Sequence, residues 1–318
     1  MIRTKRIHAV KFVISRLWNF LNIYFLKPHD AINDTITAFL LTQFDWSGDF
    51  LEIGSGDGMF GYIMHGGSFP LSYDRYKLVD QSKRDIYNTH SSGVLSTTKQ
   101  LRFPNIFVAL DPKEAHVRKI EEINFAKNVL QARYETMPFA GSSFDNVFIY
   151  TPHELKDFGA MLDEVCRITR QKGYVYILVY DAAFKRAFMC KRLSDIFKGK
   201  LKDYFLKLDN GRFAELTGMA KSQNAWHGEF EARGLIVKNS CSGLSHLGWM
   251  AYDIQTRPIL KPLIIFFGLL PDKARTCIKL VWLSLVFPYV LLALIVVFNF
   301  KKYHSTNNCY VAYQLQKL

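Results

Sequence analysis

A glycine-rich loop is the segment whose residue types and spacing best suit chemistry. Gly54, Gly56 and Gly58 alternate with other residues directly after the apolar run 49–53. Glycine is favoured where the backbone turns sharply at positive φ and where a cofactor lies against the main chain. The pattern E-x-G-x-G-x-G differs from the G-x-G-x-x-G loop that holds a pyrophosphate. We predict a cofactor site, with an ordinary strand-to-helix turn as the alternative. Its expected residues are Glu52, Gly54, Ser55, Gly56, Asp57 and Gly58.

One carboxylate, Asp111, is well placed to bind a ribose. It closes a second apolar run and precedes a helical stretch, and a carboxylate at the end of such a strand can accept hydrogen bonds from both ribose hydroxyls. Asp111 lies 53 residues after Gly58, whereas about 20 residues are usual. An insertion at 62–104 would account for the excess. Within it, Asp74 and Asp80 remain rival ribose ligands.

The elements that must position these residues follow an alternating pattern. Short apolar runs alternate with helical stretches, which is typical of a doubly wound parallel sheet, and a helix is expected near 158–170. The last run alternates like an antiparallel edge strand. The expected strands are 49–53, 105–110, 128–132, 146–150, 174–180, 235–241 and 309–316. The pattern predicts an α/β fold with a mostly parallel sheet.

Three stretches resemble the class I S-adenosylmethionine-dependent methyltransferases, a broad family that includes quinone and sterol methyltransferases. They are the glycine loop, ETMPFAGSSFDNVFIY (135–150) and MLDEVCRITRQKGYVYIL (161–178). The resemblance implies a Rossmann-like seven-stranded methyltransferase sheet with S-adenosylmethionine as the cofactor. It also implies that the glycines line the methionine and ribose, that Asp111 binds the ribose, and that the segment after the third strand binds the adenine. Arg133 stands where the family often has an acidic residue, which leaves Glu135 as the nearest carboxylate.

Methyl transfer requires alignment of donor and acceptor and exclusion of water, with a base only where the acceptor must lose a proton. In folds of this family, the loop after the fourth strand, here TPHELKD, faces the methyl group. His153 is therefore the candidate catalytic base, with Glu154 beside it, and a surface histidine is the alternative. His227 and Asp209, in the later helical region, are further candidates. No metal site is predicted, because the five cysteines are widely spaced and form no CxxC pair.

The overall charge points to an anionic partner. The 318 residues carry a formal net charge of +13 at pH 7, and 49% of them are hydrophobic, which argues against disorder. Near the N-terminus, Val10, Val13, Leu17 and Leu21 recur at helical spacing among basic residues. They predict an amphipathic basic helix within 1–30, which lies either on a membrane or on the core of the domain.

Residues 280–300 form a nearly uncharged run that is long enough to cross a bilayer. A shorter apolar run, 262–270, precedes it. Both lie between the sixth and seventh expected strands, so a single crossing would leave the last strand on the wrong side of the membrane. Basic residues, among them Arg275 and Lys279, flank the long run, and Pro288 can bend or break a helix. We predict a hairpin-like or monotopic membrane insertion, with a buried core helix as the alternative.

Together these patterns predict a membrane-associated methyltransferase whose catalytic domain faces the cytoplasm. Its expected acceptor is lipid-like or lipid-linked, because anchoring confines the site to the surface where such a substrate is concentrated. The expected organisation is an N-terminal helix at 1–30, a catalytic domain at 31–243, a membrane-associated insertion at 244–306 and the final strand at 307–318.

Two other functions compete with this prediction. The basic charge suits a nucleic-acid methyltransferase, although YTPHE replaces the N-P-P-Y type of loop used by base amino methyltransferases. That makes nucleic acid the less favoured partner. Arg133 and the long insertion at 62–104 would also suit a catalytically silent, methyltransferase-like membrane scaffold, but such a scaffold would not need three closely spaced glycines.

Overall fold

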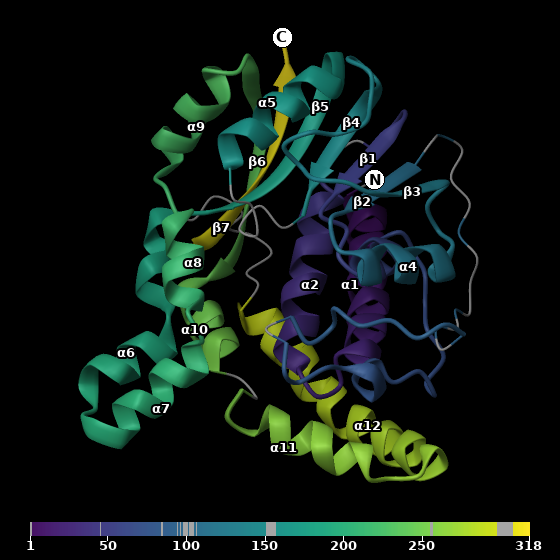
Figure 1. Cartoon of the computed structure of the whole chain (residues 1–318), viewed down its shortest axis with the longest axis vertical. Coiled ribbons are helices and arrows are strands. Elements are labelled where there is room, and N and C mark those ends of the chain that lie inside the picture. Colours follow the sequence, from purple (N-terminus) through teal and green to yellow (C-terminus); the bar gives the residue numbers. More distant parts are fainter. Residues whose placement is uncertain are drawn as a thin grey trace.

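The computed structural model describes residues 2–44, 46–83, 85–93, 95, 97, 101, 105, 107–150, 157–254, 257–297 and 308–318. A seven-stranded sheet forms its centre, with helices on both faces (Figure 1). The strands are β1 (Phe50–Ile53), β2 (Phe107–Asp111), β3 (Asn128–Gln131), β4 (Phe144–Ile149), β5 (Thr169–Tyr180), β6 (Leu235–Ser245) and β7 (Asn308–Lys317). Their order in the sheet is β3-β2-β1-β4-β5-β7-β6.

The strand pairing confirms the predicted fold class and corrects one detail. Strands β1 to β5 pair in parallel, and β7 runs antiparallel to its neighbours. The prediction that the last strand lies at the edge is wrong, because Val311 pairs with Val179 on one side and with Ser242 on the other. Both faces of β7 are covered, with Tyr310 and Tyr313 packed into different hydrophobic clusters. The edge position belongs to β6.

Helices cover both faces of the sheet. The helical elements are α1 (Ile2–Ile23), α2 (Pro28–Leu41), α3 (Met59–Met64), η1 (Arg75–Leu78), α4 (Glu114–Ile123), α5 (Phe158–Ile168), η3 (Ala182–Ala187), α6 (Met189–Ile196), α7 (Gly199–Asp209), α8 (Arg212–Gly218), α9 (Gln223–Glu231), α10 (His246–Ile254), α11 (Arg257–Gly268) and α12 (Asp272–Val297). On one face, Leu17 of α1 and Phe39 of α2 share a core with Phe148 of β4. On the other, Leu162 of α5 and Phe230 of α9 pack with the β4 side chain Val147. The helix expected near 158–170 is α5.

The amphipathic helix predicted within 1–30 is α1, and its described side chains pack on the domain. Leu17 and Leu21 are fully buried and Val13 nearly so, whereas Val10 is exposed. Burial of that apolar face stabilises the helix against the sheet by about 2 kcal/mol for each large side chain. Of the two surfaces that the sequence left open, the described part of α1 therefore uses the domain core.

The carboxyl ends of the parallel strands face the lower half of Figure 1. β7 runs antiparallel to β5 and ends near the C-terminus at the top of the view. The opposite ends of β1, β4 and β5 therefore point downward, toward the end of the molecule where α6, α7, α11 and α12 lie (Figure 1). In open α/β sheets, ligands bind at the carboxyl ends of the strands.

The two apolar runs predicted between the last strands form α11 and α12. The long helix α12 continues through Pro288 without the break that this proline could produce, and the turn between the two helices lies at 269–271. One side of α12 is fixed to the domain. Trp282 Nε1 donates to the Phe25 carbonyl at 2.8 Å, and Lys279 Nζ donates to the Tyr73 carbonyl at 2.6 Å. Arg275 pairs with Asp74, so these two basic residues bind the domain and do not flank a free membrane helix.

Candidate functional site

The glycine loop forms the tight strand-to-helix turn that its sequence predicts. Gly54, Gly56 and Gly58 have φ values of 71°, 57° and 77°, in the left-handed region that glycine adopts at low cost. The amides of Gly54 and Ser55 both donate to the Leu110 carbonyl, at 2.9 and 3.2 Å. The loop is thereby held across the carboxyl end of β2.

The space around the glycines fits a cofactor that approaches the backbone. A Cβ atom at Gly56 would meet no other atom within 4 Å, whereas one at Gly58 would lie 2.8 Å from Ile120 Cγ1. Gly58 is thus required for packing against α4, while the main chain at Gly56 borders open space. An open main chain at this turn fits a cofactor that lies against the backbone, and its contacts stay a prediction.

Asp111 lies directly beside this open segment. Its side chain is buried, Oδ2 accepts from the Gly56 amide at 3.0 Å, and Oδ1 accepts from the Lys113 amide at 2.9 Å. The rival carboxylates lie elsewhere: Asp74 pairs with Arg275, and Asp80 accepts from Ser82. The structure therefore brings Asp111, and neither rival, to the glycine loop. Its contact with a ribose stays a prediction.

A buried histidine behind Asp111 was not predicted from the sequence. His116 Nδ1 lies 3.2 Å from Asp111 Oδ1, and Nε2 lies 3.2 Å from Oδ2 of Asp85, which the insertion supplies. Burial alone would lower the pKa of His116, but hydrogen bonds to Asp111 and Asp85 outweigh it and raise this pKa to about 9. His116 is therefore a cation at neutral pH and holds the Asp111 carboxylate in place.

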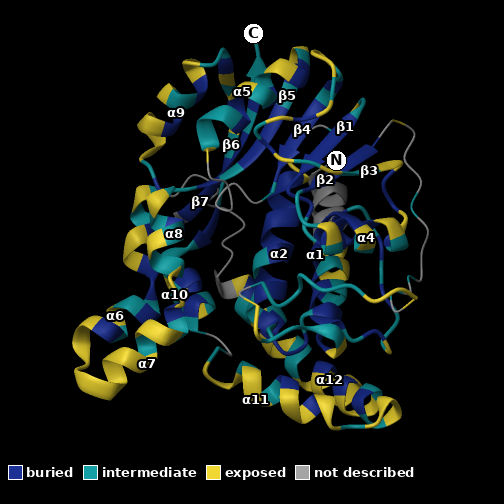
Figure 2. Ribbon diagram, in the orientation of Figure 1, coloured by how far each residue is buried: buried dark blue, intermediate teal, exposed yellow. Residues whose placement is uncertain are grey.

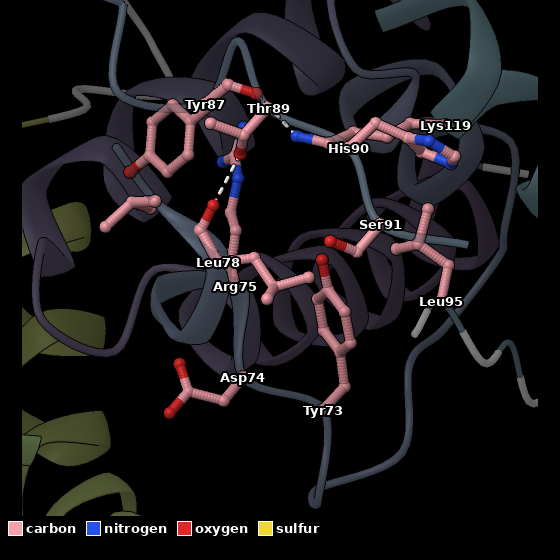
Figure 3. Close-up of a pocket in the computed structure, with 11 residues that line it drawn as sticks. Tyr73, Asp74, Arg75, Leu78, Tyr87, Thr89, His90, Ser91, Leu95 and Lys119 are labelled. Carbon is pink, nitrogen blue, oxygen red and sulfur yellow. Dashed lines mark hydrogen bonds between the residues drawn. The ribbon is translucent and has the colours of Figure 1, made fainter. Parts of the chain in front are cut away.

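A second buried charge pair joins the glycine loop to the insertion. Asp57 Oδ2 lies 2.6 Å from Arg75 Nη2, and the guanidinium lies 3.8 Å from the centre of the Tyr87 ring. Figure 3 shows Arg75 and Tyr87 at a small cavity that Lys119 of α4 also lines. Its volume is about 20 Å³, which holds a water molecule and not a nucleoside. Asp57 thus serves to dock the insertion onto the loop.

The most informative residue missed by sequence analysis is Asp34 of α2. Tyr150, which follows β4, places its hydroxyl 3.3 Å from Asp34 Oδ1, and the Tyr24 phenol is a second hydrogen-bonding neighbour. The Tyr150 amide donates to the Ile53 carbonyl at the end of β1, and its ring stacks on Phe60 at 4.3 Å. The carboxylate therefore lies at the carboxyl edge of the sheet, close to the end of the glycine loop.

The surroundings of Asp34 suit proton transfer near neutral pH. Burial, followed by the neighbouring charge of Asp30, raises the pKa of Asp34 to about 7, against the opposing effects of Tyr24, Arg75 and Tyr150. A general base works best when its pKa is close to the operating pH. A carboxyl group with this pKa exchanges protons close to neutral pH. A sequence signal existed, since Asp30 and Asp34 lie one turn apart in a helical stretch that ends in the apolar run 38–41.

Two other predicted cofactor residues stand apart from the open segment. Glu52 is 1% exposed and faces α3, where a Cβ at Gly61 would meet its Oε2 at 2.6 Å. Burial raises the pKa of Glu52 to about 8, so this carboxyl is mostly protonated at neutral pH. Glu135 is half-buried after β3, with its Oε2 3.4 Å from Arg133 Nε. Whether Glu52 and Glu135 contact the cofactor stays a prediction.

The predicted catalytic base, His153, and its neighbour Glu154 lie outside the described residues. The two further candidates have structural surroundings. His227 packs edge-on against Tyr313, whose ring belongs to the cluster on the opposite face of the sheet from Phe148. Asp209 accepts from the Phe213 amide at 3.2 Å and so caps α8. Neither lies in the Asp34 cluster.

Residues 91–177 match the model of a family described as a methyltransferase domain. No curated protein matches the sequence. One similar solved structure is an S-adenosylmethionine-dependent methyltransferase from Thermotoga maritima, named as a possible histamine N-methyltransferase, with 12% identity, 91% of each chain covered and a TM-score of 0.46. An S-adenosylmethionine-dependent methyltransferase from Aquifex aeolicus has 16% identity and a TM-score of 0.36, and the match covers 64% of this chain and 80% of that protein. A geranyl diphosphate methyltransferase bound to GPP and sinefungin has 11% identity and a TM-score of 0.42, and the match covers 89% of this chain and 77% of that protein.

The domain match, the glycine loop and the sheet agree with one another. The matched residues run through β2, β3 and β4 and most of β5, and the loop precedes them at the end of β1. Residues 91–177 carry a methyltransferase domain, as the resemblance to the class I S-adenosylmethionine-dependent methyltransferases predicts. S-adenosylmethionine is its cofactor.

Proposed function

We propose that this S-adenosylmethionine-dependent methyltransferase works at a membrane surface, where it methylates a lipid-like or lipid-linked acceptor. The observation that carries the proposal is the exposed apolar side of α12. Large apolar residues recur there every three or four positions and form one continuous stripe. The exposed members are Ile278, Val281, Trp282, Leu285, Tyr289, Leu292 and Ile295.

Beyond the buried Arg275 and Lys279, the opposite side of α12 is also apolar, with Leu283, Val290 and Leu294 buried against the domain. A helix that is apolar all round belongs in a protein core or in a membrane. Only the inner side of α12 is covered by the described chain. The exposed apolar residues Ile259, Ile265 and Phe266 of α11 extend the uncovered surface, and soluble proteins rarely expose so large an apolar area. A bilayer would cover it.

The position of α12 links this surface to the candidate site. Trp282 bonds to the carbonyl of Phe25, and the next residue back along the chain is Tyr24, a neighbour of Asp34. We propose that an acceptor enters from the bilayer beside α12 and reaches the Asp34 cluster by this route. Figure 1 supports the same direction, since α11 and α12 lie toward the carboxyl end of the sheet.

The pairing of the flanking strands favours a monotopic arrangement. Leu235 of β6 pairs with Lys317 of β7, so the chain that leaves the sheet for α11 and α12 returns to the same sheet. Both ends of the helix pair must then lie on one side of the bilayer. Among the described residues, one helical segment, Asp272–Ile295, is long and apolar enough to cross a membrane. We propose that it lies in the interface, with the catalytic domain on the cytoplasmic side.

In the proposed reaction, the glycine loop and Asp111 bind the nucleoside, and His116 keeps Asp111 oriented. The bound cofactor supplies an electrophilic methyl group on its sulfonium. Asp34 accepts the proton of an acceptor that must lose one, and the aromatic residues Tyr24, Phe60 and Tyr150 exclude water around it.

The first test is S-adenosylmethionine binding by calorimetry on the detergent-solubilised protein. Asp111→Ala and Gly56→Val should both abolish micromolar binding, because one removes the carboxylate and the other fills the open segment. The second test measures transfer of a labelled methyl group to a total membrane lipid extract and to soluble acceptors. Labelled lipid is the expected product. Turnover of soluble acceptors alone would remove the lipid acceptor, and the absence of cofactor binding by the folded wild type would favour the scaffold.

A further inference from the structure

A second exposed element lies at the same end of the molecule as α11 and α12. Helices α6 and α7 pack on each other and project from the body, and Figure 2 shows most of their surface exposed. We call residues 189–209 the basic hairpin. Its outer part combines large apolar side chains with lysines, and no other part of the described chain covers it. The exposed apolar residues are Ile196, Phe197, Leu201, Tyr204 and Leu206.

Four of the five lysines of the basic hairpin have no ion-pair partner within the described chain. They are Lys198, Lys200, Lys202 and Lys207, which are all exposed and contact no carboxylate of the described chain. Asp203 is the one acidic residue among them. The remaining lysine of the hairpin, Lys191, pairs with Asp195. The unpaired lysines leave a local excess of positive charge.

Lysines interleaved with exposed leucine and aromatic side chains suit the interface of an anionic membrane. The apolar side chains enter the boundary between headgroups and acyl chains, while the long lysine stems keep their ammonium groups among the phosphates. Nucleic acid would satisfy the lysines but would leave Ile196, Leu201 and Leu206 exposed to water. The combination therefore favours a lipid surface over RNA.

We infer that the basic hairpin is a second membrane contact, which binds anionic lipid headgroups and sets the orientation of the domain on the bilayer. This inference rests on the proposed function at a membrane surface. The apolar pair α11 and α12 provides one contact and the basic hairpin the other, and both lie at the lower end of the molecule in Figure 1. Two separated contacts fix the tilt of a domain, whereas one leaves it free to rotate. The carboxyl edge of the sheet then faces the lipid.

The test is flotation of the full chain with vesicles of phosphatidylcholine alone and with vesicles that also contain phosphatidylglycerol. The variant K200Q/K202Q/K207Q removes three charges from α7. Each lysine near an anionic surface contributes about a fivefold gain in binding, equivalent to ~1 kcal/mol. We expect the variant to bind anionic vesicles about a hundredfold more weakly, with little change on neutral vesicles. Because all three side chains are exposed, the fold and S-adenosylmethionine binding should persist.

A matched control removes three exposed charges outside the basic hairpin, in K127Q/K172Q/K238Q. This variant should bind anionic vesicles nearly as the wild type does. The inference would be overturned if both variants lost the same amount of binding to anionic vesicles, or if the α7 variant lost none. Wild-type binding that does not depend on phosphatidylglycerol would also overturn it, while the membrane proposal would stand. Binding to neither vesicle would instead reject the membrane proposal itself, and salt-sensitive binding to RNA alone would assign the lysines to nucleic acid.

Discussion

Replacing His116 tests the charged network behind the glycine loop. The histidine pKa rises from 6.5 to about 9 in the folded protein. Folding therefore favours the protonated form, and the resulting stability is fully present below pH 6.5 and is lost as pH rises through about 9. At 1.36 kcal/mol for each pKa unit, the contribution is about 3 kcal/mol. The side chain is only 6% exposed, so solvent screening removes little of this value.

His116→Gln should remove this contribution together with its pH dependence. The assay is urea unfolding of wild type and variant at pH 6, 8 and 10, with the difference in unfolding free energy taken at each pH. We expect a difference of about 3 kcal/mol at pH 6 that shrinks toward zero at pH 10. Asp85→Asn, which removes one of the two carboxylates, should shift the loss of stability to lower pH. A wild-type advantage that is the same at all three pH values would refute the reasoning.

Three further variants test other buried groups. Asp34→Asn should lower methyl transfer by roughly 100-fold or more, while calorimetry shows unchanged cofactor binding. Wild-type activity should fall below pH about 7, because the base is then protonated. Equal activity of variant and wild type would reject the role of Asp34 as a base. Glu52→Gln should be more stable than wild type at pH 8 by about 4 kcal/mol and nearly equally stable at pH 4, because burial favours the neutral carboxyl. Urea unfolding at both pH values decides this. Arg275→Leu should lower the unfolding free energy by about 3 to 5 kcal/mol, because the Asp74 carboxylate is left without its ion-pair partner. Adding Asp74→Asn to this variant should restore part of the lost stability.

Features encoded in adjacent residues were predictable from the sequence. The glycine loop dictates positive φ at Gly54, Gly56 and Gly58, because a side chain at these positions strains the backbone. Apolar runs bounded by polar turns likewise located all seven strands to within a few residues. The place of Asp111 beside the loop followed from its position at the end of a strand parallel to β1, since parallel strands bring their carboxyl ends to one edge.

Features that depend on contacts between distant segments were not predictable. The pKa of Asp34 depends on Tyr24 and Tyr150, which lie on other elements. The pKa of His116 depends in the same way on Asp85, which the insertion supplies. The interior position of β7 was missed because alternating residues suit either an edge strand or a strand covered on both faces. Continuity of α12 through Pro288 was missed because packing against the domain stabilises a helix that proline disfavours.

The interior place of β7 also sets the order in which the sheet can be completed during synthesis. β6 reaches the rest of the sheet only through β7, so it stays detached until residues 308–317 have left the ribosome. Until then, the outer edge of β5 presents unpaired backbone groups, which are prone to aberrant pairing. The apolar helices α11 and α12 emerge before β7 and meet their surroundings while the domain is still open. Their contact with lipid would then precede closure of the sheet.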